Sequence, residues 1–338
     1  MPARLTIRFA AAPARELILA EGRETIVGRD PDCGLVVEDD RVSRRHAAFS
    51  FVSSGTADSP AWTVTDLGSK NGTLVNGVRV ESRRLAERSW ISFGGLLALF
   101  EAVQAPVEEL RSDRLRRLTT ALEIRRDLDP GEGLAELLSR AVGSMLKLTN
   151  AERGFLLLVR EDGDFEVAAR SGLSWDDLRS AEFSGSVGAV ERALSAGKPV
   201  VSTDARADAD LGARASIVSG GIRALLCVPV HALDRRIGVM YADSRQPGAA
   251  FTELDLEILE ELAAQAGIAI GVARLNSELR GLAERIADDA EDTLRPDPEP
   301  SSTVAALVPG APPVPPARDF RDTWHGLLAS QETLGASS

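Results

Sequence analysis

The stretch VEDDRVSRRHAAFS, residues 37–50, places a hydroxyl, two guanidinium groups and an imidazole within four residues, Ser43 to His46. An apolar segment, residues 46–52, follows the charged one directly. A loop that leads into a strand has this pattern, because the loop faces water and the strand faces a core. Guanidinium and hydroxyl groups are also good donors to anions, so the loop is a candidate binding element.

Short strand-like segments with tight-turn signals continue on both sides of this stretch. Asn-Gly, a strong hairpin signal, occurs at Asn71-Gly72 and again at Asn76-Gly77. Closely spaced short strands predict an all-β sandwich for residues 1–104. The strand-like segments are residues 5–9, 16–20, 24–28, 34–37, 46–52, 61–67, 72–77 and 90–103.

The pattern changes to a helical period after residue 104. Leu115, Leu118 and Leu122 recur at three and four residues, which predicts a linker helix. Strand-like and helical segments then alternate, which predicts an α+β domain closed by a long helix from about Thr252 to Ala287. The expected parts after the sandwich are a linker helix at 105–127, an α+β domain at 128–276, a helix extension at 277–290 and a tail at 291–338.

The tail is rich in proline and acidic side chains. Eight of the 17 prolines fall between Arg295 and Pro316, a composition that cannot bury enough apolar surface to order itself. The tail is therefore expected to be disordered, apart from a short amphipathic helix at DFRDTWHGLL, residues 319–328.

Composition and charge narrow the class of protein. The net charge is −12, and the first 104 residues are balanced, with no basic stripe to neutralise nucleic-acid phosphates. No apolar run approaches the ~18 residues that span a bilayer. With only Cys33 and Cys227, the chain lacks the cysteines for a disulfide framework, which fits a reducing compartment. We therefore expect a cytoplasmic protein that binds neither nucleic acid nor membranes.

Loops that are far apart in sequence meet at one end of a β-sandwich. The three polar loops that carry Arg29, Ser43 and Asn71 are therefore expected to surround one point. Phosphate suits their side chains: Arg29 offers a planar fork of donors, Ser43 a hydroxyl, and Arg44 and Lys70 further charge. Asn71 has both a donor and an acceptor and can pair with the main chain of an extended peptide. The expected supports of the site are Gly28, Gly72 and His46, the last holding the loop from beneath.

Residues 5–103 resemble a forkhead-associated (FHA) domain, because the Gly-Arg, Ser-x-x-His and Asn-Gly elements occur in that family's order. The resemblance implies binding of phosphothreonine peptides, with Arg29, Ser43 and Asn71 as contacts. Lys70 departs from the small hydroxyl residue that is common before the Asn. The alternatives are a surface cation at Arg29, a plain hairpin corner at Asn71 and a domain that binds nothing.

Residues 128–276 resemble a GAF domain, through NAERGFLLLV, ALLCVPV, IGVMYADS and the long helix after them. The whole chain is similar to bacterial FHA–GAF signalling proteins. The family resemblance implies a pocket on one face of the sheet, and Asp204, Ser216, Cys227 and Tyr241 are its candidate residues. Cys227 lies between apolar neighbours, where a cysteine is generally a buried hydrophobe with an inert thiol.

Apolar stripes flank this second domain. Leu275, Leu279, Leu282 and Ile286 recur at four, three and four residues, a heptad-like seam. The stripe could pack on the Leu115–Leu122 stripe within one chain or build a parallel dimer, as GAF domains do by resemblance. We expect a homodimer.

Catalysis is not expected, since no P-loop, nucleophile-elbow, zinc-protease or kinase catalytic motif occurs. Three scattered histidines offer no metal site or catalytic triad, and no cofactor is expected. The sequence predicts a signalling adaptor whose partners are phosphothreonine proteins, a Ser/Thr kinase or its substrates. The alternatives are a sensor of cyclic nucleotides or metabolites that acts through the GAF pocket, and self-regulation by phosphorylation of Thr303, Thr323 or Thr333.

Overall fold

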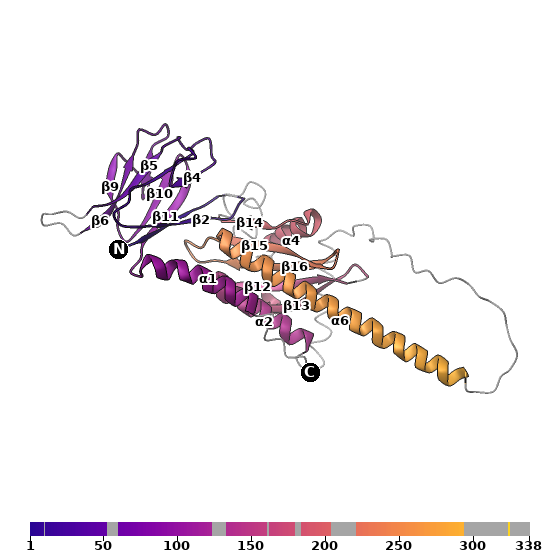
Figure 1. Ribbon diagram of the computed structural model, residues 1–338. Helices are drawn as coiled ribbons and strands as arrows, with labels where there is room; N and C mark the ends of the chain where they lie inside the picture. The colour runs from indigo at the N-terminus through magenta and orange to yellow at the C-terminus, as the bar shows by residue number, and fades with distance from the viewer. Residues whose placement is uncertain are drawn as a thin grey trace.

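A computed structural model of the protein describes residues 1–9, 11–52, 60–123, 133–160, 162–179, 184–203, 221–293 and Trp324. Figure 1 shows an N-terminal β-sandwich beside a second unit, in which helices lie along a sheet. Of the expected tail, only residues 291–293 and Trp324 lie within the described residues.

The sandwich consists of two sheets of short strands. One sheet has the order β2-β1-β11-β10-β7-β8 and the other the order β4-β3-β5-β6-β9. The only parallel pair among these described strands is β3 with β4. The strands are β1 (Ala3–Ile7), β2 (Arg15–Leu19), β3 (Thr25–Gly28), β4 (Leu35–Val36), β5 (Ala47–Val52), β6 (Ala61–Asp66), β7 (Thr73–Val75), β8 (Val78–Val80), β9 (Ser82–Arg84), β10 (Arg88–Phe93) and β11 (Leu96–Ala102).

The all-β sandwich predicted from the sequence is confirmed, with two differences in detail. The segment expected as one strand at 90–103 is a hairpin of β10 and β11, because Gly94 and Gly95 turn the chain with φ angles of 58° and 98°. Strands β8 and β9 were not predicted, because each has only three residues and most of them are exposed. Aromatic rings fill the space between the sheets, where Phe49 lies against Phe93 and Phe100.

The second unit has the predicted α+β fold. Its antiparallel sheet has the order β13-β12-β16-β15-β14. The strands are β12 (Arg153–Val159), β13 (Phe165–Ser171), β14 (Val200–Ser202), β15 (Ala224–Ala232) and β16 (Arg235–Ser244), and the helices are α1 (Val107–Glu123), α2 (Leu134–Thr149), α3 (Trp175–Arg179), α4 (Ser184–Ala196) and α6 (Glu253–Thr293).

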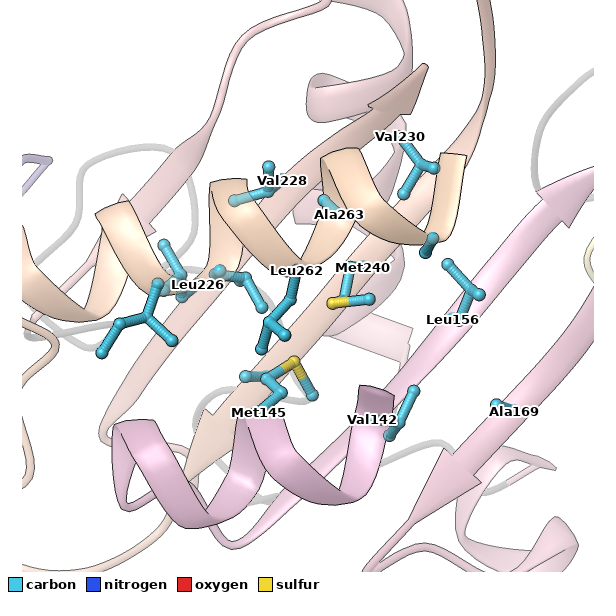
Figure 2. Close-up of a cluster of buried hydrophobic side chains, with 14 of the residues drawn as sticks. Val142, Met145, Leu156, Ala169, Leu226, Val228, Val230, Met240, Leu262 and Ala263 are labelled. Carbon is cyan, nitrogen blue, oxygen red and sulfur yellow. The ribbon is translucent and has the colours of Figure 1, made fainter. Parts of the chain in front are cut away.

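Both faces of this sheet are buried, and successive side chains alternate between them. One face packs against α2 and α6, with Met145, Leu156, Met240 and Leu262 at the centre of the cluster in Figure 2. The opposite face packs against α4 in a second cluster, whose buried sheet residues are Phe155, Leu157, Phe165, Leu225, Cys227, Val239 and Tyr241. The near-continuous apolar runs of β12, β15 and β16 follow from this two-sided burial.

Helix α6 begins with a reciprocal cap and continues past the sheet (Figure 1). The backbone N–H of Thr252 donates to the Asp255 carboxylate at 2.7 Å, and the Asp255 N–H donates to the Thr252 hydroxyl at 3.3 Å. The helix runs to Thr293, past the predicted end at Ala287 and into the segment expected as tail. None of the helices in the described part of the chain is long and apolar enough to cross a membrane.

The leucines expected to line the linker helix α1 do not share one environment. Leu118 packs against the core, and Ala121 is fully buried, but the side chain of Leu115 is 67% exposed. The side chain of Leu122 is outside the described residues. Helix α1 lies along α6 (Figure 1), and the Gln265 amide donates to the Ala121 carbonyl at 2.9 Å.

The two units contact each other where the β1–β2 connection meets the start of α6. Ala14 forms a parallel bridge with Thr252, and its N–H donates to the Phe251 carbonyl at 2.8 Å. The Arg15 guanidinium donates to the Glu253 carboxylate at 3.3 Å and to the Val36 carbonyl of β4 at 2.9 Å. One arginine therefore contacts both the first turn of α6 and the strand that leads into the 37–46 loop.

Candidate functional site

Three loops meet at one end of the sandwich through hydrogen bonds that involve the main chain. In chain order, they are the loop after β3, the 37–46 loop and the loop between β6 and β7. The Arg29 N–H, just after β3, donates to the Ser43 carbonyl at 3.0 Å. From the third loop, the Lys70 N–H donates to the Ser43 hydroxyl oxygen at 3.0 Å. Ser43 therefore lies between the other two loops, and its hydroxyl hydrogen can still be donated to a ligand.

Gly28 allows the first two loops to approach closely. A Cβ atom at this position would lie 2.1 Å from the carbonyl oxygen of Arg44, a backbone atom that cannot move aside. The same carbonyl accepts a hydrogen bond from the Asp30 N–H at 2.9 Å. Glycine is thus required here by close backbone contact, and the Gly-Arg pair places Arg29 directly beside that contact.

His46 lies beneath the loops and is fully buried. The Ser43 N–H donates to its Nδ1 at 3.1 Å, so the proton of the neutral ring is on Nε2, which donates to the Gly72 carbonyl at 3.2 Å. The ring also meets Phe93 edge-on at 5.8 Å. Burial lowers the pKa of His46, although the hydrogen bond to Gly72 and the charge of Asp66 oppose the shift. The imidazole therefore joins the second loop to the third in its neutral form.

A partly buried polar network holds the third loop, and it was not predicted from the sequence. The Ser69 hydroxyl donates to the Asp66 carboxylate at 2.6 Å, the Thr73 hydroxyl donates to it at 2.7 Å, and the Gly72 N–H donates to Ser69 Oγ at 2.9 Å. Burial raises the pKa of Asp66, but the hydrogen bonds from Ser69 and Thr73 outweigh it, so the net shift is downward. The Asp-x-x-Ser spacing before the Asn-Gly turn is the local signal that could have indicated this network.

Asn71 binds a neighbouring loop. Its amide nitrogen donates to the Arg41 carbonyl at 2.7 Å, while Arg41 forms a two-bond ion pair with Asp39 at 2.8 and 3.0 Å. The amide nitrogen thus orders the 39–43 segment. The expected pairing of Asn71 with a peptide main chain now depends on its amide oxygen. Arg41, which was not predicted as a site residue, helps to position that amide.

The charged side chains around the loops are exposed. The side chain of Arg29 is 47% exposed and donates at 3.3 Å to Asp40, which is 98% exposed. Arg44, Lys70 and Asn71 are exposed as well. An ion pair as exposed as Arg29–Asp40 is weak and easily exchanged for another anion. The end of the sandwich thus combines cationic side chains, a hydroxyl and backbone positions fixed from below; we call it the rim, defined by Arg29, Ser43, Arg44, Lys70 and Asn71.

The residues suggested for a pocket in the second unit are only partly described. Cys227 and Tyr241 are fully buried, lie opposite each other on β15 and β16, and belong to the cluster on the α4 side of the sheet. Burial raises the pKa of the Cys227 thiol, which keeps it protonated. Asp204 and Ser216 lie outside the described residues. Within the described segments, no group of three His, Cys, Asp or Glu side chains could hold a metal ion.

A cleft of about 590 Å³ lies beside the contact between the two units. Its walls carry both charges, including Arg88 and Glu101, which pair with each other at 3.4 Å. None of the predicted site residues lines this cleft, so the rim remains the candidate site.

Family comparisons match both units in the expected order. Residues 25–94 match the FHA domain and residues 133–270 match the GAF domain. The chain therefore contains an FHA domain followed by a GAF domain. Because the FHA match extends from β3 through the first glycine of the β10–β11 turn, it includes every residue of the rim.

Curated proteins and solved structures are similar to part of this chain. The glycogen accumulation regulator GarA of Mycobacterium tuberculosis is 37% identical over 76 residues, 22% of this chain and 43% of GarA. Human kanadaptin is 30% identical over 109 residues, 30% of this chain and 15% of kanadaptin. The chain thus spans less than half the length of these relatives. The solved FHA-1 domain of M. tuberculosis Rv1747 is 28% identical, with 30% of this chain and 97% of that domain covered and a TM-score of 0.25.

Proposed function

We propose that this chain is a non-catalytic signalling adaptor that binds phosphothreonine in partner proteins through the rim of its FHA domain. The observation that carries the proposal is the position of Ser43, whose carbonyl bonds Arg29 and whose hydroxyl oxygen bonds Lys70. A single phosphate placed over Ser43 would meet donors from all three loops. Kinases or their substrates are the partners that fit this chemistry, because they carry phosphorylated threonine.

The charges of the rim favour a dianion. In the free protein, Arg29 is paired with Asp40, a monovalent and fully hydrated carboxylate. A phosphate monoester carries nearly two charges at neutral pH and three acceptor oxygens, so it can displace that carboxylate and accept from the Ser43 hydroxyl as well. Lys70, at the position where a hydroxyl residue is common, adds a cation to the same side of the site.

Preference for threonine over serine requires an apolar contact with one extra methyl group. Burial of one methyl contributes ~0.8 kcal/mol, which corresponds to a preference of roughly fourfold. The decisive experiment therefore measures binding of the full chain to three matched peptide libraries, with phosphothreonine, phosphoserine or threonine at the fixed position. The expected order is phosphothreonine, then phosphoserine, then threonine. Equal binding of all three would refute the proposal.

The GAF domain has a second role in this proposal, which is to dimerise the chain through α6. Six apolar side chains repeat along α6 at intervals of four, three, four, three and four residues, and each is 46–69% exposed. A single chain leaves this seam in water, whereas a second copy would bury it by knobs-into-holes packing. The seam consists of Ile268, Val272, Leu275, Leu279, Leu282 and Ile286.

Light scattering of the full chain tests the dimer. Leu279→Glu places a charge in the middle of the seam and is expected to yield monomers at micromolar concentration. Glu284→Lys also changes a charge on α6 but lies off the seam, so that variant should remain a dimer. A monomeric wild-type protein at these concentrations would contradict the proposal and would leave phosphopeptide binding untouched.

A further inference from the structure

Trp324 is the one described residue after Thr293, the end of α6, and it is buried. Only 3% of its surface is exposed, and it is a member of the cluster on the α4 side of the GAF sheet. The Pro-rich stretch 294–323 separates it from α6 in the sequence. Trp324 thus belongs to a cluster whose other buried members all lie between Phe155 and Tyr241 in the sequence.

Trp324 contacts an aromatic side chain of the sheet. Its ring lies 6.3 Å from that of Phe155 on β12, at an interplanar angle of 49°, and Phe155 stacks on Tyr241 of β16 at 4.9 Å. Both distances are typical of favourable ring pairs. Phe155 therefore contacts two rings, that of Tyr241 from the sheet and that of Trp324 from the tail.

The Pro-rich sequence before Trp324 offers few apolar side chains that could cover its indole ring. Eight prolines fall between Arg295 and Pro316, a composition that offers no local apolar core. An indole removes roughly 150–250 Å² from water when it is buried, which is a strong reason to dock on the GAF sheet. A connection as long as 294–323 can extend to about 100 Å, so the tether does not prevent docking on its own domain.

We propose that the α4-side face of the GAF sheet is a binding site for an aromatic side chain, occupied in the resting protein by the chain's own Trp324. The site is the part of the sheet formed by Phe155 and its cross-strand neighbours Tyr241 and Cys227, and its occupant is the side chain of Trp324. Because the covalent tether holds the indole at a high effective concentration, docking is favoured without strong intrinsic affinity. Any other aromatic ligand must first displace the tail.

This arrangement differs from a fixed core residue, because the occupant can leave without unfolding the domain. The other side chains of the cluster come from the sheet, α3, α4 and adjoining segments within residues 155–241. Withdrawal of Trp324 would expose Phe155 and leave that framework in place. The GAF domain would then have a closed state with the indole docked and an open state with an apolar surface exposed to ligands.

The test uses the full chain and the dye 8-anilinonaphthalene-1-sulfonate, which becomes fluorescent on exposed apolar surface. Trp324→Ala is expected to raise dye fluorescence roughly threefold or more over wild type at unchanged circular dichroism. Trp324→Phe keeps an aromatic ring and should remain close to wild type. Deletion of residues 332–338, which leaves Trp324 in place, is the control for changes to the tail itself.

A peptide of residues 317–331 distinguishes an occupant from a structural residue. Added to Trp324→Ala, it should return dye fluorescence to the wild-type level, and the same peptide with alanine at position 324 should have no effect. A double-mutant comparison adds a second readout: the loss of thermal stability in Trp324→Ala and Phe155→Leu should be less than additive, because the two residues share one contact. Trp324→Ala and Phe49→Leu, in the sandwich, should be additive.

Two results would overturn the proposal. Unchanged dye fluorescence in Trp324→Ala, together with additive losses for the Phe155 pair, would mean that the indole does not occupy the site. Loss of the native circular dichroism in Trp324→Ala would mean that Trp324 is a permanent part of the core. Neither result would affect the phosphopeptide proposal, because the rim lies in the other domain.

Discussion

The rim of the FHA domain and the α4-side face of the GAF sheet are built by opposite means. At the rim, exposed charged side chains are held by polar groups buried beneath them, His46 and the Asp66 network. On the GAF sheet, stacked rings are buried and the occupant comes from the chain itself. A surface that recognises charge must stay hydrated until its ligand arrives, whereas a surface that recognises an apolar ring gains stability from being covered.

The largest effect is expected when a ring is removed from the GAF sheet. Phe155→Ala should lower the unfolding free energy of the GAF domain by about 3–5 kcal/mol, because it removes a fully buried ring and leaves a cavity. Urea denaturation followed by hydrogen exchange in β12 measures this loss. Phosphopeptide affinity should be unchanged, and a parallel loss of affinity would show that the two regions are not independent.

The second prediction concerns the removal of a charge from the rim. Arg29→Ala should weaken phosphothreonine peptide binding roughly 10- to 100-fold, since charged hydrogen bonds contribute about 1.5–3 kcal/mol. The melting temperature should hardly change, because the Arg29 side chain is half exposed. Fluorescence anisotropy measures the affinity. Arg83→Ala, which removes an exposed arginine from β9, is the matched control and should bind like wild type.

The third prediction concerns the neutral form of the His46 imidazole. The folded pKa of His46 is lowered below its ordinary value of about 6.5, so the stability that His46 contributes is fully present above that pH. It is lost as the pH falls below about 6.5 towards the folded pKa, because a proton on Nδ1 would oppose the Ser43 N–H. Denaturation of the FHA domain between pH 7.5 and 5 measures this dependence.

Two histidine variants provide the comparison for the pH test. His46→Asn should be less stable at neutral pH and lose the pH dependence in this range. His231→Asn, which changes an exposed histidine of β15, should keep it. Peptide binding should also weaken below pH ~6, where the phosphate gains a proton. Because this change occurs in the peptide, it should be seen with His46→Asn and with His231→Asn, provided that the variant binds.

The smallest expected effect comes from the carboxylate that pairs with Arg29. Asp40→Asn removes a competing anion from the rim, so phosphopeptide affinity should rise roughly two- to fivefold at low salt and less at high salt. Glu87→Gln changes the net charge by the same amount before β10 and is the control for long-range attraction. Equal gains in both variants would mean that Arg29–Asp40 pairing does not limit binding.

The sequence predicted the rim residues and three supports, Gly28, His46 and Gly72, but not Arg41 or the Asp66 network. Gly28-Arg29, Ser43-x-x-His46 and Asn71-Gly72 are short motifs with fixed roles in turns, so their residue types indicated a shared site. The contact of Asn71 with the Arg41 carbonyl joins two separate loops and involves a backbone atom, for which no residue type is diagnostic. The Asp66–Ser69–Thr73 network is local, and its spacing could have been recognised.

The GAF domain shows the limits of local patterns more strongly. Apolar runs predicted its buried strands and the long helix, because periodicity reports burial directly. They could not assign Trp324 to the core, since the contact with Phe155 joins segments from opposite halves of the chain. The hint in the sequence was the amphipathic segment DFRDTWHGLL, residues 319–328, which contains Trp324 in a tail rich in proline.

The bridge between Ala14 and Thr252 attaches the FHA domain to the first turn of α6. About 15 residues, or roughly 22 Å of helix, separate this attachment from Ile268, the first residue of the exposed seam. In a dimer joined along that seam, a helical segment of fixed length would separate each FHA domain from the dimer contact. Such a dimer would select partners by the spacing of two phosphates as well as by their charge. A partner with two phosphates at the matching separation would bind both rims, with an avidity that neither phosphate could reach alone.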